Sequence, residues 1–262
     1  MEWNAAVCIN FERACNADFE GGTMYGYRAR IGYTSPPAAT EVFPYEFYKI
    51  VPDGVTLVLN TLPLVDRNSD EVDRAYEVSM NAAYAMQRAG ADLFCFGGLP
   101  INVSRGFANA EDLARETEKE LGIPVITSFS AQKDAFEKTR ANKVGCIQPY
   151  DLSHTERFEG YVRELGGEPV GCAPVNAVFV TLGKVDEEQI LNIGRDLCHS
   201  HPELDTIYIP CPHFATAGVI EPLEQEFGVT VITALQAIVW RSLRGVGIDD
   251  KIDGFGKLFR EH

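Results

Sequence analysis

The sequence lacks any apolar run approaching the roughly 20 residues that a membrane-spanning helix needs. It also has little positive charge: 23 Lys and Arg stand against 38 Asp and Glu, a formal net charge of -15. Such a surface repels phosphate backbones and anionic lipids, so binding to nucleic acids or membranes is not expected. An anionic substrate is also repelled at long range, and a carboxylate site therefore needs local donors.

Several catalytic and cofactor motifs are also missing. No C-x-x-C pair, P-loop, G-x-S-x-G elbow or strand-linked G-x-G-x-x-G sequence is present. The chain does hold residues of the types that bind zinc, namely Cys198, His199, His201, Cys211 and His213. The CHSH segment, however, is predicted to end a helix, far from the strand end that precedes Cys211. We therefore predict neither a metal nor a cofactor.

Cysteine usage and the N-terminal sequence bear on the cellular compartment. The seven cysteines are an odd number, and most lie inside apolar runs such as FCFGG, GCIQP and IYIPC. This pattern is typical of reduced intracellular thiols rather than of a disulfide framework. The opening sequence MEWNAAVCINFERAC has no basic segment followed by a long apolar one, so a secretory signal is not expected. We expect a soluble, cytoplasmic protein.

From residue 30 onward, short apolar runs alternate with helical stretches. The runs predict strands at 30–35, 55–62, 91–97, 124–128, 143–149, 168–175, 205–210 and 229–233. Several are apolar throughout, as in strands buried on both faces of a parallel sheet. Asn68 is a predicted helix N-cap, and Ser153 with Glu156 forms a predicted capping box. The alternation predicts parallel α/β layers. Residues 1–29 fit no such unit and are expected to form an added arm or a dimer contact, which leaves a homo-oligomer open.

An internal repeat divides the α/β region into two similar halves. The segment from ADLFCFGGLP to GIPVITS matches the segment from LDTIYIPCPHF to GVTVITA. The matched pairs are Asp92 with Asp205, Gly122 with Gly228, and Thr127 with Thr233. In this register Gly98 corresponds to Cys211, and both lie at the carboxyl ends of strands, where parallel α/β sheets bind ligands. The repeat predicts two pseudo-symmetric half-domains with the active site in the cleft between them.

Cys211 and Tyr150 are the predicted catalytic residues. Cys211 ends an apolar strand and precedes a helix predicted from about Thr216, whose N-terminus favours the thiolate. The alternative is a buried structural cysteine, since cysteine is among the most buried residue types. The Tyr150 phenol, between a strand and a helix, is suited to donate a hydrogen bond to a carboxylate or enolate oxygen. The alternative there is a tyrosine on the rim of the site.

A proline-stiffened loop follows the first strand. It reads Pro36-Pro37-Ala38-Ala39-Thr40, and backbone N–H groups after its prolines are suited to hold a carboxylate. The alternative is a plain turn between a strand and a helix.

The segments RIGYTSPPAATE, FGGLPINVSRG, IQPY and YIPCPHFATAG resemble the Asp/Glu racemase superfamily, and the resemblance covers nearly all of residues 30–250. The superfamily includes glutamate, aspartate and hydantoin racemases, maleate cis–trans isomerase and arylmalonate decarboxylase. The chain is most similar to the last two. The racemases and the maleate isomerase use two cysteines, whereas this chain pairs Cys211 with a glycine at position 98. The resemblance implies flavodoxin-like halves and a small carboxylate substrate turned over without a cofactor.

The similarity to arylmalonate decarboxylase rests on the Pro-Pro-Ala-Ala loop, Gly98, Tyr150 and the single Cys211. Leu99 and Pro100 replace a Thr and a Ser that hold an oxyanion in that enzyme, and Pro212 replaces a Gly. Ala39 stands where maleate isomerases have Asn. Asn102, Ser104 and Asn176 are the candidates that would replace the lost donors. The predicted substrate-binding residues are Pro36, Pro37, Ala38, Ala39, Thr40, Gly98, Leu99, Pro100, Asn176, Pro212 and His213.

We expect half-domains at 30–139, completed by 236–262, and at 140–235. The expected reaction is decarboxylation of a substituted malonate, with one carboxylate held by the 36–40 loop and Tyr150. The other is pressed against apolar side chains, and the resulting enediolate is protonated by Cys211. The apolar candidates are Leu62, Leu64, Leu99 and Val175. Three alternatives stay open: an isomerase or racemase with a non-cysteine second group, a hydrolase or lyase with Cys211 as nucleophile, and a non-catalytic carboxylate-binding protein.

Overall fold

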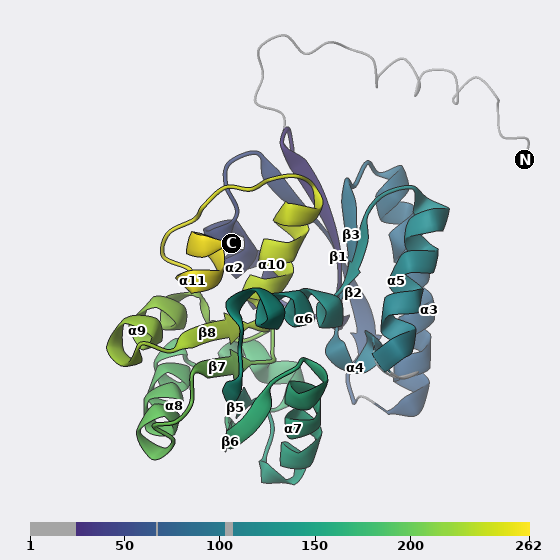
Figure 1. The fold of residues 1–262 in the computed structure, drawn as a ribbon. Helices are drawn as coiled ribbons and strands as arrows, with labels where there is room; N and C mark the ends of the chain where they lie inside the picture. Colours follow the sequence, from purple (N-terminus) through teal and green to yellow (C-terminus); the bar gives the residue numbers. More distant parts are fainter. Residues whose placement is uncertain (1–24, 67, 103–106) are drawn as a thin grey trace, which may run out of the picture.

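The computed structural model describes residues 25–66, 68–102 and 107–262, so most of the predicted N-terminal arm lies outside the described residues. The described chain forms two four-stranded parallel sheets (Figure 1). The first sheet contains, in spatial order, β2 (Val55–Leu64), β1 (Ala29–Pro37), β3 (Leu93–Phe96) and β4 (Val125–Thr127). The second contains β6 (Glu168–Pro174), β5 (Lys143–Gln148), β7 (Thr206–Ile209) and β8 (Thr230–Thr233). Each predicted strand is present, and the shared strand order confirms the two-half fold.

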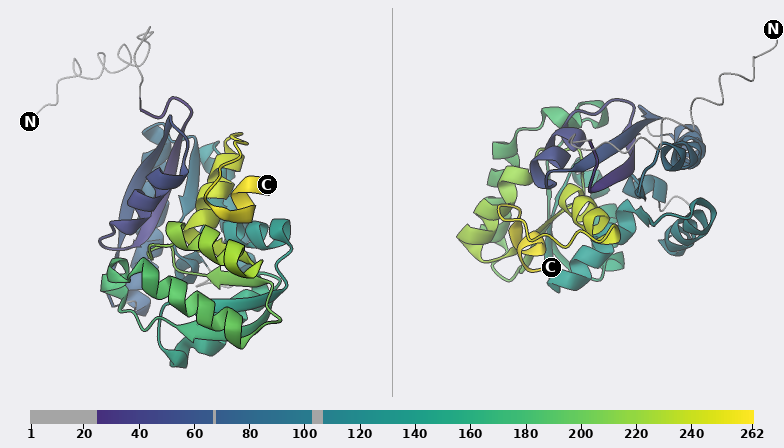
Figure 2. Two further views of the ribbon diagram at one scale, coloured as in Figure 1. Left: turned by 90° about the vertical axis from the view of Figure 1, so that its left-hand side faces the viewer. Right: turned by 90° about the horizontal axis from the view of Figure 1, so that it is seen from above.

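Helices cover both faces of each sheet. On the outer faces, α3 (Ser69–Arg88) and α5 (Phe107–Leu121) pack on the first sheet, and α8 (Glu187–Ser200) and α9 (Ala217–Phe227) on the second. Figure 2 shows these layers from two further directions. The remaining helices are α2 (Val42–Ile50), α4 (Leu99–Asn102), α6 (Ser128–Thr139), α7 (Thr155–Glu164), α10 (Ala234–Gly245) and α11 (Gly256–Glu261), with 3-10 turns η2 (Leu152–His154) and η3 (Phe179–Lys184).

The two halves are joined by an exchange of helices. Helix α6 follows β4 of the first sheet but also packs against β8 of the second. On the neighbouring strand β7, the Tyr208 hydroxyl donates to the Gln132 side-chain oxygen at 2.5 Å, and the Phe136 ring meets the Tyr208 ring edge-on with centroids 5.1 Å apart. Helix α10 follows β8 but contacts β3 and α2 of the first half, and it packs directly on α6. The core between the sheets therefore belongs to both halves.

The internal repeat extends to individual hydrogen bonds. The Asp92 carboxylate accepts from the backbone N–H of Arg30, and the Asp205 carboxylate accepts from that of Lys143. Each aspartate thus ties the start of one strand to its neighbour in the same way. Thr127 and Thr233 both form capping boxes, at the starts of α6 and α10. The paired positions predicted from the sequence are therefore structurally equivalent.

No helix in the described part of the chain is long and apolar enough to cross a membrane. The described cysteines, Cys95, Cys146, Cys172, Cys198 and Cys211, form no disulfide bond.

Replacing Thr233 with Ala should lower the free energy of unfolding by about 1–2 kcal/mol, because the change removes the fully buried N-cap of α10. Urea denaturation followed by circular dichroism measures the loss. Thr181→Ala is the control, since the Thr181 hydroxyl makes only an exposed 3.3 Å bond and its loss should change stability by less than about 0.5 kcal/mol. Equally small losses in both variants would contradict a stabilising cap at α10.

Candidate active site

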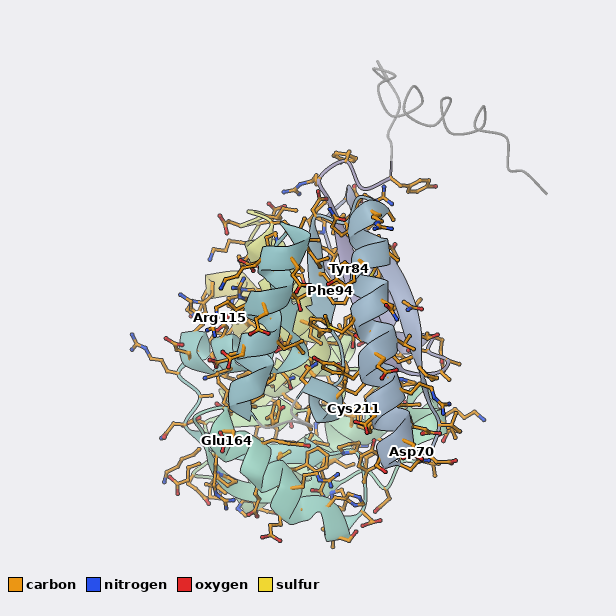
Figure 3. All side chains as sticks on the ribbon, turned by 90° about the vertical axis from the view of Figure 1, so that its right-hand side faces the viewer. Asp70, Tyr84, Phe94, Arg115, Glu164 and Cys211 are labelled. Carbon is orange, nitrogen blue, oxygen red and sulfur yellow. The ribbon has the colours of Figure 1, made fainter. Side chains whose placement is uncertain are left out.

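A cavity of about 660 Å³ lies where the carboxyl ends of the two sheets meet. Side chains of both halves line it, so neither half forms the site alone. In Figure 3 the labelled Cys211 appears near the labelled Asp70 in the first turn of α3, and Ser69 of that turn lines the cavity together with Cys211. The lining residues are Pro36, Leu64, Asp66, Ser69, Val72, Asp73, Gly98, Ile101, Pro149, Tyr150, His154, Arg157, Phe158, Tyr161, Phe179, Leu182, Pro210, Cys211, Pro212 and His213.

Gly98 and Cys211 occupy equivalent places on the cavity wall. Strand β3 ends at Phe96 and β7 at Ile209, and each residue follows two positions later. Cys211 is 6% exposed yet lines the cavity. Gly98 has a φ of +83°, and a Cβ atom there would lie 2.4 Å from Cγ of Pro36. Both the backbone conformation and the space thus favour glycine, so of these two equivalent positions one carries a thiol and the other has no side chain.

The proline loop divides between two cavities. Pro36 lines the main cavity, whereas Pro37, Ala39 and Thr40 line an adjoining space of about 20 Å³. Ala38 is exposed, and its N–H already donates to the Leu64 carbonyl at 3.2 Å. That N–H group is therefore already hydrogen-bonded to the end of β2 and is not available to a carboxylate.

His213 lies between these two cavities and lines both. Its Nδ1 is 3.2 Å from the Thr40 hydroxyl, and its Nε2 is buried without a hydrogen-bond partner. Burial lowers the pKa of His213 to about 3, because the surroundings disfavour the imidazolium. The ring is therefore neutral at pH 7, and it stands beside Cys211 as a polar but uncharged group.

Tyr150 contributes to an aromatic wall on the second half. It is half-buried, with its ring 5.3 Å from that of His154 and 6.3 Å from that of Phe158. Phe158, Tyr161 and Phe179 extend this wall into the cavity. The sequence did not identify these three residues, since helix α7 and turn η3 show no motif that would place them beside β7.

Charged groups are confined to the mouth. Asp66 and Asp73, both exposed, line the side formed by the first half, and the exposed Arg157 lines the side formed by α7. Arg157 is the only Lys or Arg among the described lining residues. The inner wall is mainly apolar, with Leu64, Ile101 and Leu182. The charged lining residues thus lie at the mouth of the cavity, and its inner wall is mainly apolar.

Other predicted site residues lie at varying distances from this cavity. Pro212 lines it, whereas Asn176 is exposed with a left-handed φ of 60° and does not. The side chains of Leu99 and Pro100, and all of Ser104, lie outside the described residues. Asn102 is buried beside the glycine pair, with its Nδ2 3.5 Å from the Gly97 carbonyl and its Oδ1 unpartnered. Leu62 and Val175 are buried in neighbouring apolar clusters.

The described residues contain no cluster of three or more His, Cys, Asp or Glu side chains that could hold a metal ion. In particular, Cys198 and His199 are at the end of α8, as the sequence predicts, and not in the cavity.

Fold and site together define the class: two parallel-sheet halves with equivalent strand ends at one cavity, as in the Asp/Glu racemase superfamily. The chain belongs to the arylmalonate decarboxylase family, because the family model described as "Arylmalonate decarboxylase" matches residues 31–259. Its relatives indicate an enzyme of lyase or isomerase type.

The comparisons with individual proteins agree with this membership. A curated maleate isomerase from Nocardia farcinica (strain IFM 10152) is 26% identical over 156 residues, which is 59% of this chain and 60% of that protein. The match thus spans less than two thirds of the curated relative. A crystal structure of arylmalonate decarboxylase is 25% identical, with a TM-score of 0.75 over 89% of this chain and 100% of that one. The maleate isomerase Iso from Pseudomonas putida S16, 21% identical, shares the fold with a TM-score of 0.79 over 89% and 98%.

Replacing Gly98 with Ala should cost more stability than replacing Gly122 with Ala. Both glycines have positive φ, +83° and +69°, but an added Cβ meets Pro36 at 2.4 Å at the first position and nothing within 4 Å at the second. We expect a further loss of about 1–3 kcal/mol for G98A relative to G122A, measured by urea denaturation. Equal losses would show that the Pro36 wall moves aside freely.

Buried His213 should make stability fall with pH in acid. The unfolded chain binds a proton at His213 below about pH 6.5, whereas the folded ring stays neutral down to about 3. Its contribution is therefore complete above pH 6.5 and decreases as the pH falls, by about 2 kcal/mol at pH 5. Between pH 7 and 5, His213→Gln should lose correspondingly less unfolding free energy than the parent chain. The exposed His199→Gln is the control and should track the parent; an H213Q variant that does the same would refute the assignment.

Proposed function

We propose that this protein is a decarboxylase of a substituted malonate or a similar carboxylic acid, with Cys211 as the acid that protonates the enediolate. One observation carries the proposal: among the described lining residues, Cys211 is the only cysteine, and the equivalent position is a glycine at which an added side chain would be strained. A racemase must move protons on both faces of a carbon. A single thiol serves one face, as the protonation step of a decarboxylation requires.

The reaction needs one carboxylate held and the other desolvated. The Tyr150 phenol is the donor we assign to the retained carboxylate, together with N–H groups near Cys211. The departing carboxylate lies against Leu64, Ile101 and Leu182, where water cannot solvate its charge and loss of neutral CO₂ is favoured. Arg157 lies at the mouth and is exposed, so it does not neutralise this group.

The bond changes balance without a further reagent. The C–C bond to the departing carboxylate breaks, CO₂ leaves, and the electron pair passes into an enediolate. The Cys211 thiol then gives its proton to that carbon, and the thiolate recovers a proton from water. Because the proton comes from one wall only, a prochiral enediolate should give a single enantiomer.

The neutral His213 fits this scheme. An imidazolium beside Cys211 would favour the thiolate, which is a nucleophile and not an acid. Burial removes that charge, so His213 supplies a hydrogen-bonding group without drawing the proton from sulfur.

An isomerase is the second candidate, because the curated relatives are maleate isomerases. It would act on maleate or a similar acid with a group other than cysteine at the second position. The two candidates separate in deuterated buffer. Release of CO₂ with one deuterium at Cα supports the decarboxylase, whereas exchange or cis–trans conversion without CO₂ supports the isomerase. Binding of small dicarboxylates with no turnover of any of them would support a non-catalytic carboxylate-binding protein.

Cys211→Ala should lower the turnover of an arylmalonate by at least about a thousandfold, since it removes the proton donor. CO₂ release and chiral chromatography of the product measure the loss. Cys172→Ala is the matched control, because Cys172 is a half-buried thiol of β6 that does not line the cavity. A folded C211A variant with parental turnover would end the proposal.

A further inference from the structure

The N-terminus of α9, directly after the Cys211 loop, is already occupied by a carboxylate. Glu46 of α2 is fully buried, and its two oxygens accept from the backbone N–H of Thr216 at 3.0 and 2.9 Å. The same oxygens accept from the N–H of Ala217 at 3.0 and 3.2 Å. Helix α2 thus contacts the active-site loop through residues 170 positions apart in the sequence.

A second carboxylate reaches the same helix end. Glu187, at the start of α8, accepts from the N–H of Gly218 at 2.6 Å. The first free N–H groups of α9 are therefore bound by two acidic side chains from two different helices. Neither of these residues lines the cavity.

Helix α2 is also packed against the groups that surround Cys211. Phe43, one turn before Glu46, stacks on the fully buried Tyr33 with ring centroids 3.9 Å apart. The centroid of the Phe43 ring lies 6.4 Å from that of the His213 ring. Burial raises the pKa of Tyr33, and Cys95 and then Cys211 add to this effect.

These contacts reverse the electrostatic effect that the sequence predicts. A free helix N-terminus carries about half a positive charge and favours a thiolate. Here two carboxylates lie on it. Burial raises the pKa of Glu46, whereas the N–H groups of Thr216 and Ala217 act in the opposite direction and stabilise its ionised form. The other ionisable groups that act on Glu46 are Lys49 of its own helix, which opposes it, and Glu187, which adds to it. Apart from Lys49, the side chains that act at this end of α9 are acidic, and negative charge near a thiol disfavours the thiolate.

We propose that Glu46, assisted by Glu187, is a positioning residue that fixes the loop of Cys211 and holds its sulfur in the neutral, proton-donating thiol form. The proposal rests on the proposed function in one respect: that function says that the Cys211 proton goes to the enediolate. The state of the sulfur can be measured without any substrate.

The test is the pH dependence of alkylation of Cys211 by iodoacetamide, followed by mass spectrometry of the peptide that contains it. In Glu46→Gln the buried negative charge is removed while the shape is kept, so the thiol pKa of Cys211 should fall by about one unit. Glu187→Gln should lower it by less, because Glu187 is partly exposed. Circular dichroism verifies that each variant is folded.

Two variants provide matched controls. Glu224→Gln removes another buried carboxylate from α9 itself, which accepts from the N–H groups of Val231 and Lys257 at its far end. Glu188→Gln removes an exposed charge next to Glu187. Both should leave the alkylation profile of Cys211 unchanged. An unchanged or raised thiol pKa in folded E46Q would overturn the proposal; should E46Q not fold, an unchanged profile in E187Q would do so.

Turnover distinguishes this proposal from the function on which it rests. If Cys211 is the proton donor, the alkaline limb of the activity profile should move to lower pH in E46Q by the same amount as the alkylation profile. A shift in alkylation with no shift in activity would support Glu46 as the residue that sets the state of the thiol and refute Cys211 as the acid.

Discussion

The exchange of α6 and α10 between the two sheets is the contact on which the rest of the structure depends. Each helix begins at the last strand of one half and buries its apolar side against the other, with Tyr208 and Gln132 bonded across the boundary. Because the apolar core is shared, the halves cannot rotate apart without exposing it. The carboxyl ends of β3 and β7 are thereby held at one cavity, and Gly98 and Cys211 become parts of a single site.

The apolar and the charged parts of that site lie apart from one another. The deep part near Cys211 combines a thiol, a neutral imidazole and apolar walls, and the charges lie at the mouth. Charge is expensive to bury, so a carboxylate drawn into the deep part is destabilised relative to products that carry less charge there. The same surroundings favour the neutral forms of the protein's own groups. In the proposed decarboxylation, a thiol that retains its proton is the acid, and a side chain at position 98 would be strained.

Sequence reasoning was most successful where the signal is local or repeated. The eight strands follow from apolar runs, and the pairing of Asp92 with Asp205 and of Thr127 with Thr233 predicts equivalent positions that the hydrogen bonds confirm. The same register placed Gly98 and Cys211 at matching strand ends. Of the loop at 36–40 only Pro36 lines the main cavity, and Asn176 is exposed; the roles of these residues stay predictions.

By itself the sequence determined the two similar parallel α/β halves, their strand ends, and the presence of one thiol at two matched strand ends. These depend on the spacing of apolar, glycine and capping residues along a short stretch of chain. Only the tertiary structure decided what surrounds that thiol: the aromatic wall from α7 and η3, the neutral state of His213, and the Glu46 carboxylate on α9. Those features arise from contacts between segments far apart in the chain, and no local pattern specifies which buried side chain meets which.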